Sequence, residues 1–178
     1  MDTGADFRLS RGDIVVRAPT RGDLPQLREV FSHPGVTRWW PEASEEELVG
    51  RVEGSDPDVV GLVVEASGAV VGFVQWYEET DPEYRHAGID IALHPDVHGR
   101  GIGSTTIRML AEWLVTDRGH HRVVIDPAAH NEQAIAAYRK AGFRPVGVMR
   151  QYWWDHVEGR WTDGLLMDAL ASELQVSD

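Results

Sequence analysis

Short apolar and β-branched runs alternate with polar segments along this chain, and the pattern predicts a series of strands and helices. Apolar runs bounded by turn residues predict strands over residues 14–17, 59–66, 70–77, 88–93, 123–125, 144–154 and 160–170. Apolar residues at helical spacing predict helices over residues 23–31, 45–52, 102–115 and 132–140.

Local signals set the ends of several of these elements. Ser44 and Asn131 are typical helix N-caps, and Gly142 is a typical residue just beyond a helix C-terminus. The pair Ser67–Gly68 predicts a hairpin turn, and the polar stretch 78–87 is expected to be a loop.

The order of the elements predicts a mixed α/β fold. We expect a twisted, mostly antiparallel central sheet of about six or seven strands with helices on both faces. Residues 1–12 are polar and are expected to form a flexible tail, and residues 13–172 are expected to form a single domain.

Composition narrows the possible partners. The 178 residues carry a formal net charge of −12, from 29 acidic and 17 basic side chains, and include no cysteine. This charge argues against nucleic acid or an anionic membrane as partner and favours a cationic ligand, although acidic surfaces also serve solubility alone. Without cysteine, neither a disulfide framework nor acyl-cysteine chemistry is expected.

The start of the sequence lacks the features of a signal peptide, and no apolar run approaches the ~18 residues of a membrane span. We therefore expect a cytoplasmic protein that acts as a monomer or homodimer.

A glycine-rich loop, His-Gly-Arg-Gly-Ile-Gly-Ser at residues 98–104, lies between a predicted strand and a predicted helix. Its amides and the helix N-terminus can converge on a phosphate, and Arg100 can pair with phosphate oxygens. The loop is not a Walker loop, since Gly103 stands where lysine is required, and it lacks the spacing of a dinucleotide fingerprint. The alternative is a tight turn that only lets the helix pack on the sheet.

Metal chemistry is not expected. His94 and His98 have a spacing seen in metal sites, but Pro95 and Gly99 exclude a helix between them.

The loop, together with the run Asn-Glu-Gln-Ala-Ile-Ala-Ala-Tyr-Arg-Lys-Ala-Gly-Phe at residues 131–143, resembles the GCN5-related N-acetyltransferase (GNAT) superfamily. One departure is His98, which stands where that family usually has glutamine or arginine. The resemblance implies acetyl-CoA as cosubstrate, with its pyrophosphate on the loop amides and direct attack by an amine in a ternary complex. It implies a coenzyme site formed by Leu93, His98, Gly99, Arg100, Gly101, Gly103, Ser104 and Asn131, with Tyr138 near the coenzyme sulfur as a catalytic residue.

Shorter segments resemble the aminoglycoside 6′-N-acetyltransferases: Arg-Trp-Trp-Pro at 38–41, Gln-Trp-Tyr at 75–77, Glu-Glu-Thr-Asp-Pro at 78–82, Gly-Ile-Asp at 88–90 and Ile-Asp-Pro at 125–127. This resemblance implies that Asp90 is catalytic and that a cationic amine, most directly an aminoglycoside, is the acceptor. The substrate-binding residues would be Trp39, Trp40, Trp76, Tyr77, Glu78, Glu79, Asp81 and Asp126.

Simpler interpretations of these residues stay open. The tryptophans also suit core packing, the acidic loop residues also suit solvent exposure, and Asp126 before Pro127 also suits a turn.

Segments 146–150 and 159–164 resemble ribosomal-protein N-terminal acetyltransferases, so a peptide α-amine is the alternative acceptor. A non-catalytic acetyl-CoA sensor is a third hypothesis, disfavoured because Asp90 and Tyr138 are both present.

Overall fold

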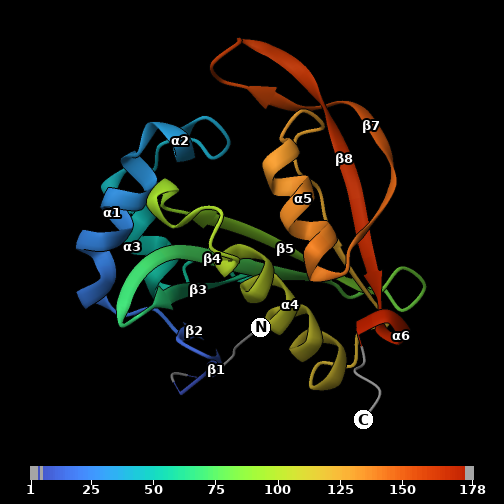
Figure 1. The fold of residues 1–178 in the computed structure, drawn as a ribbon, viewed down its shortest axis with the longest axis horizontal. Coiled ribbons are helices and arrows are strands. Elements are labelled where there is room, and N and C mark those ends of the chain that lie inside the picture. Colours follow the sequence, from blue (N-terminus) through green and yellow to red (C-terminus); the bar gives the residue numbers. More distant parts are fainter. Residues whose placement is uncertain (1–3, 5, 175–178) are drawn as a thin grey trace.

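The computed structural model describes residue 4 and residues 6–174, and in this part of the chain a single eight-stranded sheet forms the centre (Figure 1). The strand order is β1-β2-β3-β4-β5-β6-β8-β7, and only β5 and β6 run parallel. The predicted mixed α/β fold with a mostly antiparallel sheet is confirmed, with one strand more than predicted. The strands are β1 (Arg8–Arg11), β2 (Ile14–Arg17), β3 (Val59–Ala66), β4 (Ala69–Glu79), β5 (His86–Leu93), β6 (Arg122–Ile125), β7 (Arg144–Asp155) and β8 (Arg160–Leu170).

The additional strand lies in the segment that was expected to be a tail. Strand β1 pairs along its whole length with β2 across a turn at Gly12, whose φ is +62°. The tail prediction is therefore wrong for residues 8–11, while residues 1–3 and 5 lie outside the described residues. Only Leu9 of β1 packs on the core, so this edge strand lacks the apolar alternation that would have revealed it.

The loop expected over residues 78–87 is shorter than predicted. Strand β4 extends to Glu79 and β5 begins at His86, and the two strands pair at Glu78↔Ala87 and Glu79↔His86. Backbone pairing continues through these polar residues because the ladder requires no apolar side chain at an exposed hairpin end.

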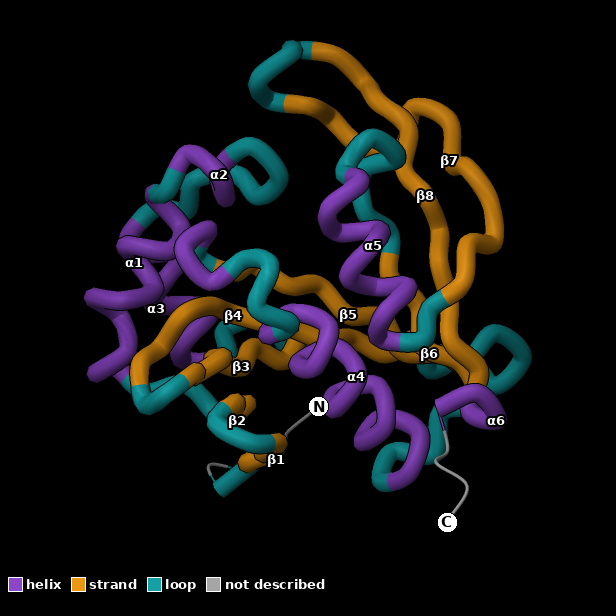
Figure 2. Tube along the Cα trace, in the orientation of Figure 1, coloured by secondary structure: helices purple, strands orange, loops and turns teal. Residues whose placement is uncertain are grey.

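Helices cover both faces of the sheet (Figure 2). On one face, α1 and α3 pack Leu27 and Leu48 against Phe73 of β4; on the other, Leu110 of α4 packs in a cluster with Trp76. No helix in the described ranges combines the length and apolar character needed to cross a bilayer. The helices are α1 (Leu24–Ser32), α2 (Pro34–Thr37), α3 (Glu45–Glu53), α4 (Ile102–Thr116), α5 (Glu132–Ala141) and α6 (Ala171–Leu174), with 3-10 turns at Arg21–Asp23 and Pro95–Val97.

The predicted helix ends are confirmed by their capping contacts. Ser44 and Glu47 form a capping box at the start of α3, and the Asn131 side chain accepts a bond from the Ala134 amide at the start of α5. Gly142 ends α5 with a φ of +103°, a conformation that glycine adopts without strain.

The parallel strands β5 and β6 separate soon after they meet. They pair only at Ala87↔Val123 and Gly88↔Val124, although β5 continues to Leu93. Beyond Gly88, β5 pairs with β4 alone. The sheet is therefore split between β5 and β6, and the C-terminal residues of both strands border the split.

Gly72 of β4 keeps the split part of β5 in place. A methyl group at Gly72 would come within 2.4 Å of the Ala92 carbonyl oxygen, which is backbone and cannot rotate away. We expect Gly72→Ala to lower the free energy of unfolding by about 1–3 kcal/mol in a denaturant titration. Gly147→Ala on β7 is the control, because nothing lies within 4 Å of its added carbon. Equal stability of the two variants would contradict this packing argument.

Candidate active site

A cleft of about 630 Å³ fills the split between β5 and β6. Its walls come from residues 90–93 of β5, the glycine loop, the first turn of α4, the end of β6 and the cleft-facing side of α5. Residues of the 35–41 segment and of β7 close it from other sides. The cleft therefore brings together segments from residue 35 to residue 153 of the chain.

The glycine loop presents backbone donors to this cleft. Gly99 and Gly101 have φ values of +75° and +81°, and α4 begins directly after Gly101 without a side-chain cap. The first amides of a helix have no partner within the helix, so those of α4 are available to a ligand. Gly99, Gly101, Gly103 and Ser104 all line the cleft, which is the arrangement that binds phosphate in proteins.

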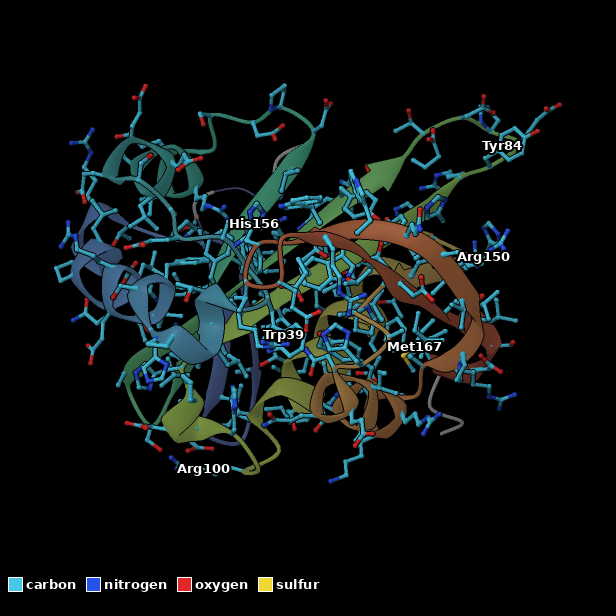
Figure 3. The ribbon with its side chains drawn as sticks, turned by 90° about the horizontal axis from the view of Figure 1, so that it is seen from above. Trp39, Tyr84, Arg100, Arg150, His156 and Met167 are labelled. Atoms are coloured by element: carbon cyan, nitrogen blue, oxygen red, sulfur yellow. The ribbon has the colours of Figure 1, made fainter. Side chains whose placement is uncertain are left out.

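Of two predicted side chains of this loop, His98 lines the cleft and Arg100 does not. The His98 ring lines the cleft and its Nε2 donates to the Leu93 carbonyl oxygen at 3.1 Å, so it braces the loop. Arg100 does not line the cleft and lies at the rim of the molecule, away from Trp39 (Figure 3). The pKa of Asp13 is lowered mainly by the Ser67 hydroxyl and to a smaller extent by the Arg100 charge, which places Arg100 on the Asp13 side.

Helix α5 brings two predicted residues to the cleft. Asn131 lines it at the N-terminus of the helix, where its side-chain oxygen accepts from the Ala134 amide at 3.1 Å. Tyr138 lines it two turns later with only 8% of its surface exposed. Burial, with the charges of Asp90 and Asp126, raises the pKa of Tyr138, so its hydroxyl stays protonated and can donate.

Two carboxylates face the cleft from the separated strands. Burial raises the pKa of Asp90, and the Asp126 charge adds to this, while a bond from Gln75 Nε2 at 3.1 Å and the Arg51 charge oppose it. Burial also raises the pKa of Asp126, opposed by a 2.5 Å bond from the Tyr152 hydroxyl. Both groups accept protons more readily than an exposed aspartate does.

Aromatic side chains from opposite sides of the cleft meet one another. The Trp39 ring lies 5.1 Å from His130 and 6.3 Å from Trp153, measured between centroids. Arg38 stacks on Trp39 and forms an ion pair at 3.7 Å with Glu158, in the turn between β7 and β8. The tip of the β7–β8 hairpin thus extends toward the side of the molecule on which α2 lies (Figure 1).

Both predicted tryptophans of the 38–41 segment line the cleft. Trp40 also packs edge-on against Phe31 at 5.5 Å, so it belongs to the core as well as to the cleft wall. Aromatic faces of this kind attract ammonium groups.

The prediction that Trp76 binds substrate is wrong. Side chains alternate along a strand, and Trp76 points to the α4 face, where it is fully buried against Trp113. Tyr77 points to the opposite face and packs on Gly88. Burial first, and then the charges of Asp126 and Asp90, raise the pKa of Tyr77 to about 12, so it lies near both carboxylates although it does not line the cleft.

The three acidic residues after Tyr77 are likewise not part of the cleft. Glu78 pairs with Arg118 at 3.1 Å and with His120 at 2.8 Å, which ties β4 to the end of α4. Glu79 and Asp81 accept bonds from amides of their own turn. Figure 3 shows Tyr84, in the same turn, at the far edge of the molecule from Trp39.

Sequence reasoning missed several residues of the site, among them Gln75, Tyr152 and Trp153, which line the cleft, and His130, which contacts Trp39. Strand alternation could have found Gln75, because it lies opposite Asp90 in the register of β4 and β5. Nothing in the sequence pattern indicates that residues of β7 reach the cleft. In the described part of the chain, no group of three or more His, Cys, Asp or Glu residues is placed to hold a metal ion.

Comparison with known proteins gives the class. Residues 24–143 match the model of the acetyltransferase (GNAT) family. The chain belongs to this family, and the resemblance seen in the glycine loop and in residues 131–143 is confirmed.

Individual relatives within this family are acetyltransferases that act on different acceptors. The chain is 30% identical over 159 residues to aminoglycoside N(6′)-acetyltransferase type 1 of Klebsiella pneumoniae, covering 79% of this chain and 78% of the relative. It is 24% identical over 164 residues to spermidine N(1)-acetyltransferase of Escherichia coli K12, covering 89% and 86%. The solved structure of AAC(6′)-Ib with paromomycin and acetyl-CoA superposes with a TM-score of 0.75 at 24% identity, covering 94% of this chain and 99% of that one.

The raised pKa of Asp90 predicts a pH-dependent effect on stability. Burial makes ionisation of Asp90 costly to the fold, and this cost is lost when the carboxyl becomes protonated as pH falls through its raised folded-state pKa. We expect Asp90→Asn to raise the free energy of unfolding by about 0.5–2 kcal/mol at pH 7.5 and to change it little at pH 4, measured by denaturant titration. Asp96→Asn, at a side chain that is 86% exposed, is the control and should change stability little at either pH. A loss of stability in Asp90→Asn at pH 7.5 would contradict this account.

Proposed function

We propose that this protein transfers the acetyl group of acetyl-CoA to a primary amine of a cationic small molecule, and that the acceptor is the 6′-amine of an aminoglycoside. The observation that carries the proposal is the pair of partly buried carboxylates, Asp90 and Asp126, in a cleft that also contains aromatic faces and the glycine loop. The 30% identity to an aminoglycoside 6′-N-acetyltransferase supports this acceptor.

In this proposal the coenzyme occupies the glycine-loop side of the cleft. The amides at the start of α4 receive the pyrophosphate, and Asn131 contacts the arm of the coenzyme. That arm lies along β5 beyond Gly88, where the strand pairs with β4 alone. The uncapped helix and the unpaired strand edge are the features that support this placement.

The acceptor amine attacks the thioester carbonyl carbon directly, and the carbon–sulfur bond breaks. An amine attacks only when it is neutral, so Asp90 receives the proton that the ammonium loses, directly or through water. The departing thiolate receives a proton from the Tyr138 hydroxyl, whose raised pKa keeps it protonated. The nitrogen loses its second proton as the amide forms, and that proton restores the Tyr138 hydroxyl. Asp126 and the aromatic faces of Trp39 and Trp40 bind the remaining cationic part of the acceptor.

A polyamine is the second candidate acceptor. The similarity to a spermidine acetyltransferase extends over 89% of this chain, and an anionic, aromatic cleft suits a linear polyamine as well as an aminosugar. The alternative acceptor suggested by segments 146–150 and 159–164 is a peptide α-amine. A peptide α-amine requires no second carboxylate in the site, so the presence of Asp126 beside Asp90 favours the other acceptors.

A thiol-release assay with acetyl-CoA distinguishes these acceptors. Neomycin and paromomycin differ only in a 6′-amine against a 6′-hydroxyl, so we expect turnover of neomycin and at least about 100-fold less of paromomycin. Spermidine and short N-terminal peptides complete the panel. Equal turnover of neomycin and paromomycin would exclude the 6′-amine, and preferred turnover of spermidine or of peptides would assign the acceptor accordingly.

The coenzyme loop is tested by substitution of Gly101. Valine there is strained at a φ of +81° and places methyl groups where the phosphate would lie. We expect Gly101→Val to weaken acetyl-CoA binding at least about 10-fold by calorimetry. Gly119→Val has a similar φ of +70°, lies outside the cleft and controls for strain alone. Unchanged affinity in a folded Gly101→Val protein would rule out the loop as the phosphate site.

The role of Tyr138 is tested by removing its hydroxyl. Tyr138→Phe should lower kcat about 100-fold with little change in the Kd of acetyl-CoA, because the hydroxyl acts only when the thiolate departs. Full turnover in this variant would instead make Tyr138 a core residue of α5.

The role of Asp90 is tested by pH dependence of turnover. Asp90→Asn keeps the shape of the side chain but cannot accept a proton, so turnover of neomycin should fall about 100-fold or more while acetyl-CoA binding persists. Part of the loss should be recovered as pH rises, because more of the amine is then neutral. Normal turnover across the pH range would show that Asp90 is not the base.

A further inference from the structure

Strand β7 is interrupted by a bulge beside the cleft. Its register with β8 passes from Met149↔Gly164 to Trp153↔Thr162, so three residues of β7 oppose one residue of β8. Gln151, at the centre of the bulge, has a φ of +51°, and its amide donates to Asp163 Oδ1 at 2.8 Å. A residue with a side chain adopts this conformation at a cost of about 1–2 kcal/mol, and bulges beside active sites redirect a neighbouring side chain.

The side chain that this bulge redirects is Tyr152. Its ring packs against Gly164 of β8, where an added methyl group would come within 2.8 Å of Cδ1. Its hydroxyl donates to Asp126 Oδ2 at 2.5 Å, and the residue lines the cleft. The positive φ of Gln151 and the missing side chain of Gly164 together allow the Tyr152 hydroxyl to reach the Asp126 carboxylate.

The two cleft carboxylates therefore have different donors. Asp90 accepts a hydrogen bond from the side-chain amide of Gln75 at 3.1 Å, and Asp126 accepts a shorter one from the Tyr152 hydroxyl. A hydrogen-bond donor aimed at a carboxylate favours its charged form, and a short O–H donor does so strongly. The Tyr152 bond therefore opposes the effect of burial, which on balance still raises the pKa of Asp126.

We propose that Tyr152 is a positioning residue that fixes Asp126 as an anionic anchor for a second ammonium group of the acceptor, leaving Asp90 free to receive the proton. This inference depends on the proposed cationic acceptor. In this arrangement Asp126 binds the acceptor and Asp90 takes part in the reaction. The site then selects amines that carry another positive charge nearby.

The titrating groups around Asp126 come from four elements. Tyr152 belongs to β7, Tyr77 to β4, Asp90 to β5 and Tyr138 to α5, and each is coupled to Asp126 by charge or hydrogen bond. The three phenols remain neutral through the working range because their pKa values are raised, so Asp90 is the member of this set whose charge changes together with that of Asp126.

Acceptor selectivity gives the first test. In Tyr152→Phe we expect the KM for neomycin to rise about 10-fold with kcat changed less than about 3-fold, because anchoring is lost while the reacting groups remain. The single-amine sugar 6-amino-6-deoxyglucose has no second ammonium, so its kcat/KM should not change. Tyr84→Phe, at an exposed tyrosine on the β4–β5 turn, is the matched control and should leave both acceptors unaffected.

A readout independent of turnover separates this inference from the proposed function. Titration of the aspartate side-chain carboxyl carbons by NMR in the acceptor-free protein should show the pKa of Asp126 higher in Tyr152→Phe than in the wild type. If that shift is found but the wild type acetylates no amine, the positioning role stands and the proposed function falls. An unchanged Asp126 titration together with an unchanged ratio of kcat/KM for the two acceptors would overturn the inference.

Two further variants test the bulge without removing the hydroxyl. Gly164→Ala should displace the Tyr152 ring and raise the KM for neomycin as Tyr152→Phe does. Gln151→Gly should keep the bulge, because glycine adopts a positive φ freely, and should retain wild-type selectivity. Wild-type selectivity in a folded Gly164→Ala protein that has lost the Tyr152–Asp126 bond would also overturn the inference.

Discussion

The site depends on one interruption of backbone pairing, the separation of β5 from β6 after Gly88. Had the two strands stayed paired, the cleft would be closed and Asp90 and Asp126 would lie within a continuous sheet. Their separation instead leaves both carboxylates in a partly enclosed space, and that burial is the main reason why their pKa values are raised. The reactivity of the site is therefore a consequence of sheet topology.

The lining of the cleft combines groups of opposite electrostatic character. It contains the partial positive charges of the uncapped α4 N-terminus as well as two carboxylates and several aromatic faces. In a protein with a net charge of −12, neutral backbone amides still allow an anionic group to approach the helix end. An anionic and a cationic ligand can therefore occupy the same cleft at the same time, each beside the groups that suit its charge.

Periodicity and capping predicted most of this fold, and the glycine loop with residues 131–143 predicted the family. Alternation along β4, applied strictly, would also have replaced Trp76 by Gln75 on the side of Asp90. Other features could not be read from the sequence. Strand β1 has a nearly polar sequence, and Tyr152 reaches the cleft only because Gln151 adopts a positive φ within a three-residue bulge. Such a conformation is stabilised by tertiary contacts and leaves no local pattern.

The β7–β8 hairpin has a further consequence for how this protein can change over evolution. The family match ends at residue 143, directly before β7, yet Tyr152 and Trp153 of the cleft come from that hairpin. Strand β8 joins the rest of the sheet through four residue pairs with β6 and a bridge between Ala128 and Gly164, and its Met167 and Ala169 are buried in the core. Substitutions at the cleft-facing positions of this hairpin can therefore alter one wall of the cleft while the glycine loop and α5 stay as they are.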